Sequence, residues 1–203
     1  MAYCPRRARM PTLALLALDT RFASLLRNSR EPMLAQMRFA WWRETLASEP
    51  SGWPEGEPLL GALRSWSGRL DALRGLAEGW ELLTGPAPLP REAMHNFAQA
   101  RGEAFAALCD LLGRDDVAGM AASQARAWAI ADLSTRLSDP VECETAVSLL
   151  EAQDWAKAEL PRMMRPLAVL HGLVERDVRG TAPKQGAGLL TMLAAIRLGL
   201  LGR

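Results

Sequence analysis

The chain of 203 residues is long enough for one domain of ordinary size whose hydrophobic core is stable without a metal ion or a disulfide bond. Apolar residues make up 49% of it and charged residues 23%, a balance that excludes a disordered chain and favours a globular protein. A net charge of +1, with no basic stripe interleaved with aromatic residues, argues against nucleic-acid binding, because phosphate neutralisation dominates that affinity.

Helix is the predicted secondary structure along the whole chain. Val and Ile together number only eight, whereas Leu and Ala are abundant, and this composition favours helix and disfavours sheet. The first predicted helix covers residues 11–28, because Pro11 is typical of a helix start. Leu15, Leu18 and Phe22 then follow at spacings of three and four residues and mark one apolar face.

The two ends of the chain have features of targeting or membrane segments. The basic residues 1–10 and the apolar run 13–18 superficially resemble a secretory signal, but the run is short and Asp19 follows it directly. We therefore predict a first helix and a cytoplasmic location. The apolar stretch 186–202 is interrupted by Arg197 and predicts a buried last helix, with contact to a membrane surface as the alternative.

A second helix is predicted to begin at Pro32 and to be apolar on most of its sides, which is typical of a central helix. It is followed at residues 48–58 by five proline and glycine residues, which predict a surface loop. The residues of this helix predicted to point inward are Met33, Leu34, Met37, Trp41 and Leu46, with Phe39 and Trp42 widening the apolar arc.

The middle of the chain predicts a broken helical stretch and then a long regular helix. Four glycines interrupt residues 59–83, so the limits of the pieces are not defined by the pattern, and a loop follows at residues 85–90. Residues 91–112 carry a clean helical pattern of large apolar side chains, and Gly113 is typical of a helix end.

Helix caps divide the second half of the chain. Either Asp115 or Asp116 is predicted to cap a helix with an alanine-rich face that ends near Leu137. Asp139 before Pro140 marks the next start. The remaining predicted helices run to about Glu159, over residues 167–178, and over the apolar stretch near the C-terminus after a loop at 180–186. About eight helices without an internal repeat predict an all-α, single-domain helical bundle over residues 1–203.

Cysteine and histidine residues predict no metal or redox centre. Cys4, Cys109 and Cys143 show no CxxC spacing, so we predict reduced cysteines of the kind found in cores. His171 and Glu175 lie one helical turn apart, but two ligands without a third seldom bind a metal, and a solvated pair is the favoured interpretation. The sequence also lacks the GxSxG, P-loop and GxGxxG motifs of hydrolases and nucleotide-binding proteins.

The segment 15–46 resembles the opening helices of the squalene/phytoene synthase family. Most of the likeness lies in residues 31–46, EPMLAQMRFAWWRETL, which contain the adjacent pair Trp41 and Trp42. Residues 125–137, ARAWAIADLSTRL, are similar to the second catalytic helix of that family. The resemblance implies a single squalene/phytoene synthase-like domain with the isoprenoid-synthase fold.

The resemblance also implies a Mg²⁺-dependent reaction, but this chain lacks most of the acidic residues that bind the metal in the family. Members of the family join two allylic diphosphates head to head, and two DxxxD motifs hold the Mg²⁺ ions that bind the diphosphate. The positions of the first motif fall on Ala23 and Arg27, and those of the second on Asp132 and Arg136. In the whole sequence no two acidic residues lie four positions apart. We therefore predict no catalytic residue, no metal ligand and no cofactor, with Mg²⁺ required only if the protein is an enzyme after all.

The resemblance implies a pocket lined by aromatic and arginine side chains. Simple core packing is the alternative for Trp41 and Trp42, and surface salt bridges are the alternative for the arginines. Asp132 is the acidic residue predicted to point inward, with a surface position as its alternative. The candidate ligand-binding residues are Phe22, Met37, Arg38, Trp41, Trp42, Arg101, Trp128, Asp132 and Arg136.

Three functions remain open from the sequence. The leading hypothesis is a non-catalytic relative that binds an isoprenoid or lipid or acts as an assembly factor, as a family member does for respiratory complex I. The second is an active prenyl-transferring enzyme that condenses isoprenyl diphosphates with Mg²⁺. The third is a protein-interaction module without a ligand. Diphosphate release would identify the enzyme, co-purifying lipid would separate lipid binding from a ligand-free module, and captured respiratory subunits would support the assembly role.

Overall fold

The computed structural model describes residues 4–29, 31–153, 155, 159–180, 192 and 195–199 of the chain. The described residues form α-helices joined by short 3₁₀ turns and contain no β-strand, so the all-α prediction is confirmed. Most of the predicted C-terminal helix lies outside the described residues, although residues 195–199 are helical. In chain order the helices are α1 (Arg6–Asn28), α2 (Pro32–Ala47), α3 (Pro58–Leu63), α4 (Leu70–Glu81), α5 (Arg91–Leu111), α6 (Ala118–Ser134), α7 (Pro140–Glu151) and α8 (Arg165–Val178).

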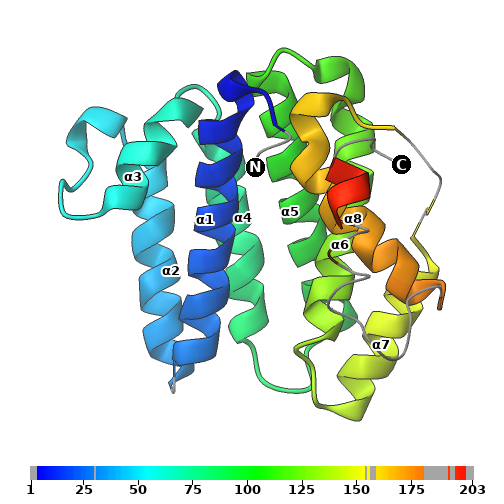
Figure 1. Ribbon diagram of the computed structural model, residues 1–203. Coiled ribbons are helices and arrows are strands. Elements are labelled where there is room, and N and C mark those ends of the chain that lie inside the picture. The colour runs from blue at the N-terminus through cyan, green and yellow to red at the C-terminus, as the bar shows by residue number, and fades with distance from the viewer. Residues whose placement is uncertain are drawn as a thin grey trace.

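The longer helices pack side by side into one bundle (Figure 1). Helix α2 packs on α4, α4 on α5, and α5 on α6, while α7 and α8 cover the opposite side of α6. Helix α1 runs in front of α4 and contacts α3, α4 and α5. In this arrangement α1 and α6 lie on either side of α5. The candidate site described below lies between these two helices.

One contiguous hydrophobic core joins all eight helices. It contains the aromatic rings of Phe39 and Trp42 from α2 and of Phe97 from α5, all of them buried. Inside the core, the Trp66 N–H donates to the Pro11 carbonyl at 3.0 Å. A continuous core of this kind defines a single bundle.

Small residues allow α4, α5 and α6 to approach closely. A Cβ atom added at Gly79 of α4 would lie 2.5 Å from the Ala100 Cβ of α5, and one added at Gly102 would lie 3.0 Å from the Ala122 carbonyl oxygen of α6. Ala125 on the predicted small-residue face of α6 is fully buried. The prediction that this alanine face receives a neighbouring helix is confirmed, and the neighbour is α5.

The first helix begins earlier than predicted. Helix α1 starts at Arg6, and Pro11 lies inside it instead of at its start. The residues before Pro11 are anchored, because Cys4 and Ala8 are buried against Met163 and the Cys4 thiol donates to the Met163 carbonyl at 3.6 Å. This packing stabilises the extra turns although proline lacks an N–H for the helical ladder.

Of the two helix caps predicted in the second half of the chain, the structure confirms the cap of α7 and not that of α6. Asp139 accepts hydrogen bonds from the backbone N–H groups of Val141 and Glu142 at 2.9 and 3.2 Å, so it caps α7 as predicted. The prediction that Asp115 or Asp116 caps α6 is wrong. Both belong to the 3₁₀ turn that leads into α6, no side chain among the described residues caps that helix, and the Asp116 carboxylate pairs with Arg114 at 2.7 Å. The ends of α6 and α7 also come earlier than predicted, at Ser134 and Glu151.

Helix α2 lies at the edge of the bundle, and its predicted central position is therefore wrong. It contacts α4 and, less extensively, α1, so only one of its sides is covered (Figure 1). Phe39, Trp42 and Leu46 are buried on that side as predicted. The outward side carries four large apolar residues predicted to point inward: Met33, Leu34, Met37 and Trp41, which are 69%, 45%, 63% and 41% exposed.

None of the helices in the described part of the chain combines the length and the hydropathy needed to cross a bilayer.

Candidate functional site

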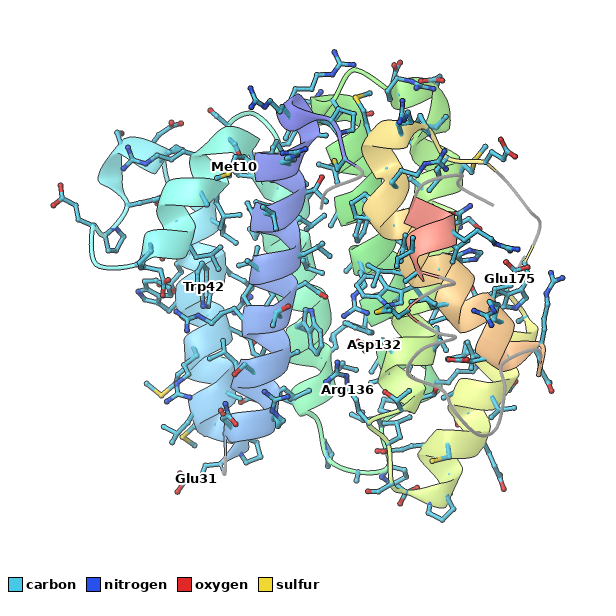
Figure 2. All side chains as sticks on the ribbon, in the orientation of Figure 1. Met10, Glu31, Trp42, Asp132, Arg136 and Glu175 are labelled. Carbon is cyan, nitrogen blue, oxygen red and sulfur yellow. The ribbon has the colours of Figure 1, made fainter. Side chains whose placement is uncertain are left out.

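A pocket of about 320 Å³ lies between α1 and α6, with α5 behind it and Leu170 of α8 at its side. We call it the α1–α6 pocket. Its charged lining residues come from three helices: Asp19 and Arg27 from α1, Arg101 from α5, and Asp132 and Arg136 from α6. Figure 2 shows Asp132 and Arg136 on the side of α6 that faces α1.

Arg101 forms the floor of the α1–α6 pocket. It is 1% exposed and lies on the buried face of α5. Its Nε and Nη2 atoms donate to the two carboxylate oxygens of Asp19 at 3.1 and 2.9 Å, in the two-pronged geometry that suits a guanidinium. Its Nη1 and Nη2 atoms also donate to Asp132 at 3.3 Å. One buried arginine therefore links α1, α5 and α6.

Three aromatic rings surround the Arg101 guanidinium. Its central carbon lies 4.2 Å from the centroid of Trp128, 4.8 Å from that of Phe97 and 5.3 Å from that of Trp80. A cation among aromatic faces is stabilised by the ring quadrupoles, and the planar guanidinium stacks better than an ammonium group. The arrangement requires an arginine at this position for both charge and shape.

Asp19 is a buried carboxyl group surrounded by donors. Burial raises the pKa of the Asp19 carboxyl above its ordinary value of 3.8, while the Arg101 guanidinium and the Trp80 indole N–H lower it. The Trp80 N–H donates to Asp19 at 2.8 Å. Because Arg101 and Trp80 both donate to Asp19, the geometry fits the ionised carboxylate.

Two arginines stand at the solvent side of the pocket. Arg136 donates from Nη2 to Asp132 at 2.8 Å, one helical turn away on α6. Arg27 of α1 is exposed and makes no ion pair or hydrogen bond within the described part of the chain. Asp132 therefore accepts hydrogen bonds from two arginines, Arg101 at the floor of the pocket and Arg136 at its solvent side.

A second, apolar pocket of about 290 Å³ adjoins the first. Its walls come from the start of the chain, from α1, from α8 and from the helical residues near the C-terminus, and they include Cys4, Val169 and Ile196, with Arg165 as a charged lining residue. Leu16 and Leu170 line both pockets, so the two hollows meet at these side chains.

Four of the nine predicted site residues meet at the α1–α6 pocket: Arg101, Trp128, Asp132 and Arg136. Asp132 points inward as predicted. Phe22 and Trp42 are instead buried in the core, where their rings contact each other with centroids 5.7 Å apart.

The remaining three predicted site residues lie on α2, outside both pockets. Met37, Arg38 and Trp41 are exposed, and the structure does not bring them to a common site with Arg101. They lie on the side of α2 that faces solvent, and none of them lines either of the two pockets. His171 also differs from its predicted solvated pairing: it is 5% exposed and stacks on Trp155 with ring centroids 5.4 Å apart.

The positions that the family resemblance assigns to metal binding do face a single pocket. Ala23 and Arg27 on α1 and Asp132 and Arg136 on α6 all line the α1–α6 pocket. As a ligand set for a magnesium cluster these residues do not fit, since they supply one carboxylate and it accepts from two arginines. Within the described ranges there is no group of three or more Asp, Glu, His or Cys side chains placed for a metal ion.

Sequence reasoning missed Asp19 and Trp80 as members of the site. The signal for Asp19 was available, because it lies on the apolar arc defined by Leu15, Leu18 and Phe22, where an acidic residue must be buried with a partner. No local pattern identifies that partner, since Arg101 and Trp80 are more than sixty residues away along the chain.

Comparisons of the chain with protein-family models, with curated proteins and with solved structures give no match in any of the three. Membership of the squalene/phytoene synthase family, which residues 31–46 resemble, therefore stays a prediction.

Proposed function

We propose that this chain is a non-catalytic, squalene/phytoene synthase-like protein that binds an isoprenoid or another lipid with an anionic head group. The observation that supports this most is the junction of a charged and an apolar pocket at Leu16 and Leu170. An amphiphile places its head group in the first and its chain in the second. Ligand sites of this kind combine apolar walls with a few converging polar groups.

The side chains of the α1–α6 pocket support binding in preference to catalysis. Ionising an allylic diphosphate requires positive charge that bridges to its oxygens, and in the family that the sequence resembles this charge comes from carboxylate-bound Mg²⁺. Here Asp132 is engaged by Arg101 and Arg136, and Asp19 by Arg101 and Trp80. These carboxylates are therefore already neutralised by the protein itself.

The test is to incubate the protein with farnesyl diphosphate, with and without Mg²⁺, and to measure both retained ligand and released diphosphate. We expect retained ligand and no diphosphate release. Turnover above the rate without protein shows the alternative, an active prenyltransferase. No retention, together with no lipid found by mass spectrometry after mild extraction, favours a ligand-free interaction module.

A matched pair of substitutions locates the binding in this experiment. Val169→Trp fills the apolar pocket and should reduce retention at least tenfold, because lost apolar burial of about 1.4 kcal/mol changes affinity by that factor. Val147→Trp makes the same change on the exposed side of α7 and should leave retention unchanged.

An assembly role is a second candidate, favoured by the outward apolar side of α2. Four residues lie within about a quarter of the helix circumference and are exposed in the part of the chain that the structure describes: Met33, Leu34, Met37 and Trp41. If the protein assembles respiratory complex I, affinity capture should recover subunits of that complex with the wild type. The double substitution Met33→Ser, Met37→Ser should abolish capture while lipid retention persists.

A further inference from the structure

We infer that Arg27 and Arg136 bind a phosphate group of the amphiphile directly, with no bridging metal ion. The inference rests on the proposed function and specifies the head group of its ligand. It starts from the charges that line the α1–α6 pocket: three arginines stand against two aspartates, which leaves one positive charge without compensation. An anion bound in the pocket supplies the missing negative charge.

The excess charge lies at the solvent side of the pocket. Arg101 is held at the floor by Asp19 and Asp132, with three aromatic rings around it, so it is not free to turn towards a ligand. Arg136 donates to Asp132 through Nη2, and its other guanidinium N–H groups can donate to a ligand. Arg27 has no partner in the described part of the chain. Both arginines are exposed.

The chemistry of the guanidinium selects phosphate as the anion. Its planar fork matches two oxygens of a phosphate at once, and two forks from facing helices can hold a dianion between α1 and α6. A divalent cation has no comparable site, since it would have to displace arginines from both carboxylates and enter a pocket of net positive charge. The neighbouring apolar pocket, entered past Leu16 and Leu170, takes the chain of the amphiphile.

The test uses dodecyl phosphate as the probe, with dodecanol and inorganic phosphate as its two halves, in the presence of a chelator. We expect dodecyl phosphate to bind most tightly and more weakly at high salt, because the contact is electrostatic. Arg27→Gln and Arg136→Gln should each weaken it about tenfold, the loss of one hydrogen-bonded charge contact. Arg38→Gln, at an exposed arginine of α2 outside both pockets, should leave it unchanged.

The outcomes separate this inference from the proposed function. Equal affinity for dodecanol and dodecyl phosphate overturns the phosphate contact but leaves lipid binding in place. Equal affinity for inorganic and dodecyl phosphate overturns the claim that the alkyl chain is bound. Binding that appears only when Mg²⁺ replaces the chelator overturns the claim of a metal-free contact. If no probe binds, the proposed function fails as well. Unchanged melting temperatures of the two arginine variants establish that they are folded.

Discussion

At the scale of single residues, Arg101 is the side chain on which the site depends. Arg101→Met leaves Asp19 buried with only the Trp80 N–H as donor, and an unpaired buried charge costs about 3 to 5 kcal/mol. The free energy of unfolding, measured with urea, should fall by that amount. Arg74→Met removes an arginine that makes exposed ion pairs on α4 and should cost less than about 1 kcal/mol. Equal losses at the two positions contradict the buried cluster.

His171 should make stability depend on pH. Burial lowers the pKa of the imidazole from its ordinary value of 6.5, an effect that Glu175 opposes and Arg179 reinforces. As the pH falls below 6.5, the unfolded chain takes up a proton that the folded protein resists, so the free energy of unfolding decreases. Nε2 has no hydrogen-bond partner among the described residues that could accept the proton on that nitrogen.

The check on His171 is to measure urea unfolding from about pH 8 to about pH 5 for the wild type and for His171→Gln. The wild type should lose more stability over this range than the variant. Subtracting the two curves removes the other titrating groups, which the proteins share. Curves that run parallel would show that this imidazole does not titrate differently on folding.

At the scale of the helices, Gly79 allows α4 to approach α5. Gly79→Ala places a methyl group 2.5 Å from the Ala100 Cβ and 3.4 Å from the Phe97 Cα, so it should destabilise the protein by about 1 to 3 kcal/mol. Gly75→Ala makes the same change on α4 with no atom within 4 Å. It should stabilise by up to about 1 kcal/mol through helix propensity. Thermal melting compares the two, and a stabilised Gly79 variant would contradict this packing.

Helix positions could be predicted from the sequence where a local rule sets them. Asp139 before Pro140 marked the start of α7 correctly, because a cap and a proline act within one turn. The side on which α2 is buried could not be predicted, since an apolar helix looks the same whether one face or two are covered. Pro11 misled the prediction of α1 because the contact that extends the helix comes from Met163, far along the chain.

At the scale of the whole molecule, the candidate site was predictable in part. The family resemblance assigned four metal-binding positions on two distant segments. All four line one pocket: Ala23, Arg27, Asp132 and Arg136. Local patterns cannot reveal that Arg101 would lie between those segments, because its place depends on how α1, α5 and α6 pack. The apolar pocket beside it was likewise not predictable, as its walls come from the two ends of the chain.

A crystal structure of the protein with dodecyl phosphate would show where the amphiphile binds. We propose that one amphiphile occupies the two adjoining pockets, with its head group against Arg27 and Arg136 and its chain past Leu16 and Leu170. We expect the phosphorus atom to lie between these arginines, with no metal ion beside it. A probe lying on the outward side of α2, or a phosphate held through magnesium at Asp132, would contradict this proposal.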